Sequence, residues 1–195
     1  LWEGDIEKIK NFLKNKVPNN KKTKDPFFFY FHSFDFLNDL QEISTETLRI
    51  HGRELTSHWI KKNSSWKSNT WEDFILATRI CNWIKNYNFF FSTADEEFKK
   101  NIFNSISKQI EHLVKNFSNP KRNSDLIRII KALIYTSISI PNKKYYYQIA
   151  IFNLKSELSR QILSDGCHFQ RNPKIHVNVL MDLLDIRAIL NSTKK

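Results

Sequence analysis

The sequence predicts an all-α protein, and three observations support this prediction. Apolar residues recur every three or four positions over long stretches, which is the period of one face of an α-helix. Only three Gly and five Pro occur in 195 residues, too few for the many tight turns of a β-rich fold. The connections between the periodic segments are short, so consecutive helices are expected to be antiparallel neighbours, as in bundles and helical toroids.

Four helical segments are predicted in the first half of the chain. The Phe-dense run 27–40 is long and carries apolar residues on nearly every face, so we expect one buried helix there. Ser44 and Thr45 are residue types that favour a helix N-terminus. The predicted helices are 1–16, 27–40, 44–62 and 71–83, the last with Phe74, Ala77, Thr78, Cys81 and Ile84 on its inner face, and polar stretches separate them at 19–25 and 63–70.

Four more helices are predicted in the second half. The clearest is 95–117, where apolar residues step by three and four until Asn119-Pro120 ends the helix. Ser124 or Asp125 is expected to cap the next helix. The last three predicted helices are 125–140, then a helix that stops at Gly166 and has Tyr147, Ile151, Leu154, Leu158 and Ile162 on its inner face, then 174–190 with Ile175, Val179, Leu180, Leu183 and Leu184.

Charge and composition indicate which classes of binding partner to expect. The net charge of +11 suggests an anionic partner, although an abundance of Lys, Asn, Ile and Phe is also typical of an AT-rich genome. The Lys residues are scattered and no basic motif stands out, which argues against nucleic acid. The chain has no run of eighteen apolar residues, so we expect no membrane-spanning helix.

Motifs for metals, cofactors and common catalytic centres are missing. Neither the six His nor Cys81 and Cys167 have a convincing zinc spacing, and the phosphate-binding, dinucleotide-binding and nucleophile-elbow patterns do not occur. We therefore expect no metal and no cofactor in this chain. The chain opens at Leu1 without a signal-peptide pattern, and we interpret it as part of a longer protein whose compartment the residues leave unknown.

The segment around the expected helix end at Gly166 is the richest in polar functional groups. His168, Arg171 and Asn172 follow it within six residues and concentrate hydrogen-bonding groups at a helix end. The planar fork of Arg171 fits a carboxylate or a sulfate. The alternative is that Asp165 and Arg171 only tie the loop together.

Three parts of the chain together form a pattern. They are Phe34 to Leu40, then Trp71 with Arg79, Asn82 and Trp83, and finally Asp165-Gly166-Cys167-His168-Phe169-Gln170-Arg171-Asn172-Pro173 followed by His176 and Leu183-Leu184-Asp185. In this order they resemble the helical domain of heparinase II/III-like proteins, a superfamily of polysaccharide lyases that includes a bacterial branch. The resemblance covers nearly the whole chain.

The resemblance implies a fold and a function. The fold is an incomplete (α/α) toroid of antiparallel helical hairpins, with 1–195 as a single helical domain and a C-terminal β-sandwich domain that this chain lacks. The function is cleavage of an acidic, uronate-containing polysaccharide by β-elimination, in the periplasm. A structural metal is conceivable only in the missing domain. Periodicity alone does not separate a toroid from a bundle.

β-Elimination needs a group that neutralises the uronate carboxylate, a base that removes the neighbouring proton, and an acid that protonates the leaving oxygen. In the family an Asn-His pair, a Tyr and a His of the β-sandwich have these roles. Here the pair falls on Ser124-Asp125, or on Asn123-Ser124, and Ile175 stands where a Tyr would precede His176. Either another residue supplies the proton transfer, such as Tyr145, Tyr146, Tyr147 or His168, or the chemistry differs.

The candidate site residues follow from these observations. His168 and His176 are predicted to orient groups or to exchange protons, and Arg171 to bind an acidic group. Trp66, in a polar loop, is the best candidate for stacking on a sugar, ahead of Trp59, Trp71 and Trp83, of which Trp83 is expected in the core. The predicted substrate-binding residues are Arg171, Asn172, Arg79, Asn82 and Trp66. Because the family's Tyr and Asn-His pair are missing, a non-catalytic glycan-binding module is the alternative function.

Overall fold

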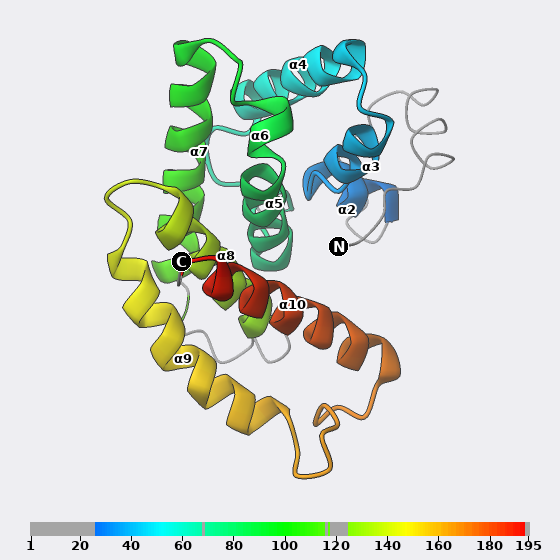
Figure 1. The fold of residues 1–195 in the computed structure, drawn as a ribbon, viewed down its shortest axis with the longest axis vertical. Helices are drawn as coiled ribbons and strands as arrows, with labels where there is room; N and C mark the ends of the chain where they lie inside the picture. The colour runs from blue at the N-terminus through cyan, green and yellow to red at the C-terminus, as the bar shows by residue number, and fades with distance from the viewer. Residues whose placement is uncertain (1–25, 68, 116, 118–124, 194–195) are drawn as a thin grey trace. The chain divides into compact units, whose positions relative to one another are not determined.

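The computed structural model describes residues 26–67, 69–115, 117 and 125–193. Every named element within these residues is a helix, which confirms the predicted all-α class (Figure 1). The helices are α2 (Pro26–His32), α3 (Phe36–Ile43), α4 (Glu46–Lys62), α5 (Asp73–Lys85), α6 (Tyr87–Phe90), α7 (Glu96–Lys115), α8 (Leu126–Ser139), α9 (Tyr145–Gln161) and α10 (Pro173–Ser192). The predicted helix 1–16, the loop 19–25, Asn119-Pro120, Asn123 and Ser124 lie outside the described residues.

The chain divides into two compact units by its internal contacts. Unit 1 is Leu1–Gln109 and contains α2 to α6 with most of α7. Unit 2 is Ile110–Lys195 and contains the end of α7 and α8 to α10. The toroidal arrangement of the hairpins stays a prediction, and so does the single domain.

A cluster of three aromatic rings lies in the core of unit 1. Phe34, Trp59 and Trp83 are each at most 2% exposed. Their ring centroids lie 5.1 to 5.8 Å apart, and all three pairs meet edge to face. This geometry brings the positive edge of one ring to the negative face of another and adds about 0.5–1.5 kcal/mol per pair to the burial of the rings.

The predicted single helix over 27–40 is wrong, because the chain turns at Ser33–Asp35 between α2 and α3. Phe34 has a φ of 62°, a left-handed conformation that is unfavourable for a bulky residue. The tertiary structure stabilises it, because this conformation inserts the Phe34 ring into the aromatic cluster, where it is fully buried. Local periodicity carries no signal for such a turn.

The structure confirms the predicted limits of α4 but corrects the predicted inner face of α5. Thr45 caps α4, since its hydroxyl accepts a hydrogen bond from the Leu48 N–H at 3.4 Å. The single inner face predicted for the fourth helix is wrong, because α5 is buried on nearly all sides from Ile75 to Trp83. Phe74 and Ile84, two of the five predicted inner residues, are only half-buried.

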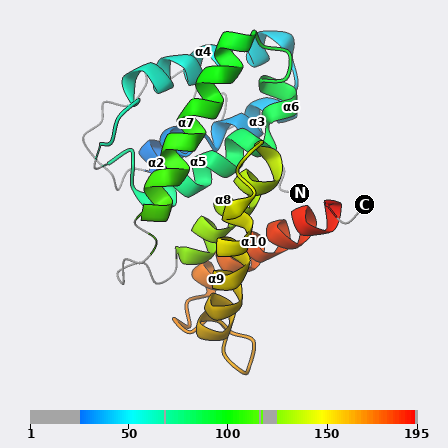
Figure 2. The same cartoon turned by 90° about the vertical axis from the view of Figure 1, so that its left-hand side faces the viewer.

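In unit 2, α8 packs against both α9 and α10 (Figures 1 and 2). The helix is rich in Ile and Leu, and nine of its fourteen residues are buried. It begins and ends as predicted, but Asp125 stands at its N-cap position without the expected side-chain cap bond. An ion-pair cluster joins α8 to α10. Asp182 accepts from Arg128 Nε at 2.6 Å and from Lys131 Nζ at 3.0 Å, and its side chain is 5% exposed.

The buried residues correct the predicted inner faces of α9 and α10, and α9 ends at Gln161 rather than at the predicted Gly166. On α10 the buried residues are Val179, Asp182 and Ile186, while Leu180 and Leu184 are 47% and 45% exposed. Because α8 presents two cations, a carboxylate rather than a leucine faces it. On α9 the predicted inner residue Tyr147 is exposed, and the buried residues are Tyr146, Ala150 and Gln161.

Among the described residues, no helix combines the length and the apolar character that crossing a bilayer requires.

Substitution of Gly52 by Ala is expected to destabilise the protein, although Gly52 lies inside a helix. Ala normally stabilises a helix interior by about 1 kcal/mol relative to Gly. Here a Cβ on Gly52 would lie 2.7 Å from two ring atoms of Phe90, which is itself fully buried. We expect Gly52→Ala to lower the free energy of unfolding by about 1–3 kcal/mol in urea denaturation. Lys62→Ala, at an exposed position of the same helix, is the control, and a Gly52→Ala variant more stable than wild type would contradict the prediction.

Candidate functional site

The polar segment predicted as a site forms a closed turn between α9 and α10. Ile162 and His168 form an isolated antiparallel bridge. Two backbone hydrogen bonds of 2.9 Å close it further, from Leu163 N to the Cys167 carbonyl and from Phe169 N to the Gln161 carbonyl. Gly166 has a φ of 81°, which Gly adopts at no steric cost. We call residues 162–172 the 162–172 turn.

A buried imidazole holds this turn on α9. His168 is fully buried, and its Nε2 lies 3.1 Å from Oε1 of Gln161, which is also fully buried. Its Nδ1 accepts from Gln170 N at 3.3 Å. The amide of Gln161 donates to Glu157 at 2.7 Å, so its oxygen must accept, and the proton of His168 belongs on Nε2. Burial lowers the pKa of His168, and the nearby His176 and Arg160 lower it further, which keeps the ring neutral.

This geometry corrects the predicted proton-exchange role of His168. Both ring nitrogens are engaged inside the protein, and neither reaches solvent. His168 is therefore a positioning residue of the turn. His176 differs, because it is half-buried and its Nδ1 accepts from the backbone N–H of His168 at 3.2 Å. When the ring of His176 is neutral, its proton is therefore on Nε2. Among the described residues, no hydrogen-bond acceptor for this Nε2–H is found.

The turn exposes one guanidinium. Arg171 has a left-handed φ of 52°, and its Nη1 forms an ion pair with the carboxylate of Asp165. The two side chains are 57% and 48% exposed. The hydrogen bond from Arg171 holds the pKa of Asp165 below its usual value, and the N–H of Cys167 adds to this at 3.0 Å. Asp165 and Arg171 thus tie the turn together, as the alternative interpretation of this loop predicted, while the Arg171 side chain remains exposed to solvent.

Asn172 connects the turn to α10. Its side-chain oxygen accepts from Lys174 N at 3.0 Å and from Ile175 N at 3.3 Å, which caps the helix. Asn172 is itself exposed, and Arg171, Asn172 and His176 therefore lie together at the N-terminal end of α10.

Arg79 and Asn82, the other predicted substrate-binding residues, lie in unit 1 and are buried. Arg79 is fully buried and donates to Gln109 Oε1 at 2.8 Å and to the carbonyl oxygens of His32 at 2.7 Å and Thr70 at 3.1 Å. Its guanidinium also lies 4.1 Å from the centre of a Trp59 ring.

Asn82 is 8% exposed and donates to Ser33 O at 2.9 Å and to Asp35 Oδ1 at 2.7 Å, so it holds the turn between α2 and α3. The structure therefore gives both Arg79 and Asn82 structural roles, because neither side chain is open to a ligand.

Comparison with known protein families identifies the family of the chain. Residues 53–195 match the family model described as the heparinase II/III N-terminus. The chain belongs to this family. The match includes α5 and the 162–172 turn, and it leaves out Phe34 to Leu40. No curated protein and no solved structure matches the chain.

The tyrosines of α9 cannot replace the family Tyr at this turn. Tyr145, Tyr146 and Tyr147 begin α9, and the turn follows its other end. At 1.5 Å per residue, the sixteen steps from Tyr145 to Gln161 span about 24 Å. Tyr146 is also buried, and this burial raises its pKa. Ile175, which the resemblance places at the position of the family Tyr, has an aliphatic side chain that cannot transfer a proton.

Of the four Trp residues considered for sugar stacking, only Trp66 is exposed, at 61%. Trp59, Trp71 and Trp83 are at most 7% exposed and belong to the core, as expected for Trp83. The stacking role of Trp66 stays a prediction. Within the described ranges, no group of three or more His, Cys, Asp or Glu side chains could hold a metal ion.

We expect His168 to stabilise the turn. His168→Leu removes the hydrogen bond between His168 Nε2 and the fully buried Gln161 Oε1, and an intramolecular hydrogen bond contributes about 1 kcal/mol to stability. The free energy of unfolding in urea should fall by that amount. Gln170→Ala, at an exposed position of the same turn, should leave it nearly unchanged. Equal stability of the two variants would contradict the positioning role.

We also expect the chain to lose stability in mild acid through His32. Its Nδ1 accepts from Trp59 Nε1 at 2.9 Å, and burial, helped by the charge of Arg79, lowers its pKa from 6.5 to about 4. The unfolded chain therefore binds the proton first, so stability falls as the pH drops from 6.5 to 4, by on the order of 3 kcal/mol. His32→Gln should reduce this loss in unfolding experiments across that range.

His58→Gln is the matched control, since His58 is exposed on α4 and should leave the acid sensitivity unchanged. A loss as steep in His32→Gln as in wild type would rule out His32 as its source.

Proposed function

We propose that this chain is the glycan-binding helical domain of a polysaccharide lyase that cleaves an acidic, uronate-containing glycan by β-elimination. Membership of the heparinase II/III N-terminal family supports the class of protein. The single observation that supports a site is the geometry of the 162–172 turn. Buried His168 holds this turn in place, and Arg171 is exposed beside Asn172 and His176.

The turn offers the first of the three groups that β-elimination needs. The guanidinium of Arg171 stays protonated and presents N–H donors in a plane that matches a carboxylate. The Nε2–H of His176 is a second donor. Neutralising the uronate carboxylate in this way stabilises the negative charge that develops when the neighbouring proton leaves.

The proton transfers themselves need other residues. Arg171 does not give up its proton, and His176 has its Nδ1 occupied by the backbone of His168. We assign the base and the acid to the C-terminal β-sandwich domain that the family resemblance implies. This chain then contributes binding and orientation, which lower the entropic part of the barrier.

A non-catalytic glycan-binding module is the second candidate, and Ile175 favours it. Full-length protein incubated with uronate-containing polysaccharides separates the two functions, because β-elimination leaves an unsaturated uronate that absorbs in the ultraviolet. A lyase is expected to produce this absorbance. Its absence with every acidic glycan, together with measurable binding, would leave the binding module.

We expect Arg171→Ala to weaken binding of a uronate-containing polysaccharide by roughly tenfold to a hundredfold, since a hydrogen bond to a charged group contributes about 1.5–3 kcal/mol. Isothermal titration calorimetry of the full chain measures this effect. Arg187→Ala is the matched control, because it removes the same charge from an exposed position of α10. Equal losses in both variants would show that net charge, not the turn, determines binding.

A further inference from the structure

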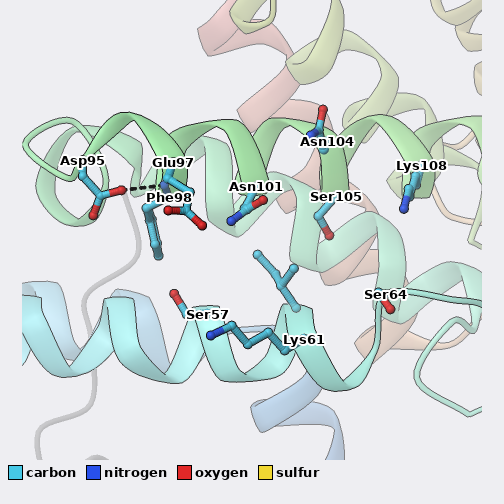
Figure 3. Close-up of a pocket in the computed structure, with 11 residues that line it drawn as sticks. Ser57, Lys61, Ser64, Asp95, Glu97, Phe98, Asn101, Asn104, Ser105 and Lys108 are labelled. Carbon is cyan, nitrogen blue, oxygen red and sulfur yellow. Dashed lines mark hydrogen bonds between the residues drawn. The ribbon is translucent and has the colours of Figure 1, made fainter.

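An open groove lies between α4 and α7 in unit 1 (Figure 3). Its volume is about 500 Å³. A neighbouring pocket of about 440 Å³ shares Ser57, Lys61, Asp95 and Phe98 with it, so the two form one continuous groove along α4. The lining of the larger part is Ser57, Ile60, Lys61 and Ser64 from α4, and Asp95, Glu97, Phe98, Asn101, Asn104, Ser105 and Lys108 from the segment that begins α7 and from α7 itself. We call this the α4–α7 groove.

Polar side chains occupy the facing surfaces of the two helices. On α7 the spacing of Asn101, Asn104, Ser105 and Lys108 places them on one face. A helix face that packs against a neighbouring helix is normally apolar, so these residues are not an ordinary packing surface. In the described part of the chain, Asn101 and Asn104 have no recorded hydrogen-bond partner for their side chains, and both line the groove. In Figure 3 the Asn101 amide points toward the groove, whereas the Asn104 amide points away from α4.

Ser105 is held in place from the core. The Nε of buried Arg79 donates to Gln109 Oε1 at 2.8 Å, and this fixes the orientation of the Gln109 amide. The Nε2 of Gln109 then donates to Ser105 Oγ at 3.0 Å. Because the Ser105 oxygen accepts that bond, its own O–H remains as a donor, and no partner for it is recorded among the described residues. Arg79 thus acts on the groove without reaching it.

The charges and the floor of the groove indicate the class of ligand. Lys61 and Lys108 are balanced by Asp95 and Glu97, so the lining has no excess of charge that would favour a nucleic acid. Phe98, which is 9% exposed, provides an apolar floor.

Amides, hydroxyls and an apolar floor match a chain of sugar rings, whose hydroxyls both donate and accept while their C–H faces are apolar.

We infer that the α4–α7 groove is a second glycan-binding site that holds an oligosaccharide segment through the hydroxyls of its sugars rather than through its carboxylates. The sugar class rests on the proposed function. The mode of binding does not, because the groove lies in unit 1 and uses neutral hydrogen bonds, whereas the 162–172 turn lies in unit 2 and uses Arg171.

Two probes separate the sites: a uronate-containing polysaccharide, and the same polymer after chemical reduction of its carboxyl groups to alcohols. Asn101→Ala with Asn104→Ala removes two groove amides at exposed helical positions where Ala is favourable. Each lost hydrogen bond is expected to weaken binding about fivefold. The double variant should therefore bind both polymers roughly tenfold to thirtyfold more weakly, whereas Arg171→Ala should affect only the acidic one.

Matched controls test whether the loss is specific. Asn88→Ala removes an exposed amide of α6 outside the groove, and it should bind both polymers as wild type does. Ser105→Ala should weaken binding of the carboxyl-reduced polymer about fivefold, while Ser107→Ala, on the same helix but outside the lining, should not. Circular dichroism of each variant checks that α7 remains folded.

Each outcome decides between the two proposals. If the double groove variant binds both polymers as tightly as wild type while Arg171→Ala weakens acidic binding, the groove inference is overturned and the proposed function stands. If the groove variant weakens binding of both polymers while Arg171→Ala changes neither, the groove is supported and the role of the turn fails. If wild type binds neither polymer, both proposals fail.

Discussion

The burial of Arg79 constrains several segments of unit 1 at once. Removing a guanidinium from water is costly, and in this protein three oxygen acceptors and the face of Trp59 compensate for it. The acceptors belong to the end of α2, to the loop before α5 and to α7, so a single side chain connects three segments that are distant in the sequence. Through Gln109 the same side chain also fixes a hydroxyl at the α4–α7 groove. Burial thus gives Arg79 a function that does not require it to meet a ligand.

Helices whose ends carry local signals could be predicted from the sequence. Thr45 before α4 and Pro141 after α8 act within one helical turn, so the residues themselves define those ends. The turn at Phe34 could not be predicted, because its conformation is unfavourable locally and is stabilised by rings that arrive from α4 and α5. The orientation of α10 was missed for a related reason. A carboxylate on an apolar stripe is expected to face solvent unless the cations of a neighbouring helix are known.

The position of the polar turn at a helix end could be predicted from the sequence, but the contacts of its members could not. Polar residues at a helix end are visible in any sequence, and whether this turn is the functional site stays a prediction. His, Arg and Asn side chains occur both as ligand contacts and as buried structural residues, and His168, Arg79 and Asn82 are buried here. Only tertiary burial separates those two uses. The α4–α7 groove was not predicted at all, although the run of Asn and Ser on one face of α7 was a signal that could have revealed it.

The ion pairs of Asp182 have a consequence for the rotation of α10 about its own axis. An apolar stripe tolerates some rotation of a helix, because dispersion contacts are not directional. A carboxylate held by both Arg128 and Lys131 does not, since each hydrogen bond has a preferred angle. His176 lies six residues earlier, about 120° around the helix from Asp182. The ion pairs at Asp182 fix the rotation of α10 about its axis. They therefore also set the direction in which Nε2 of His176 points.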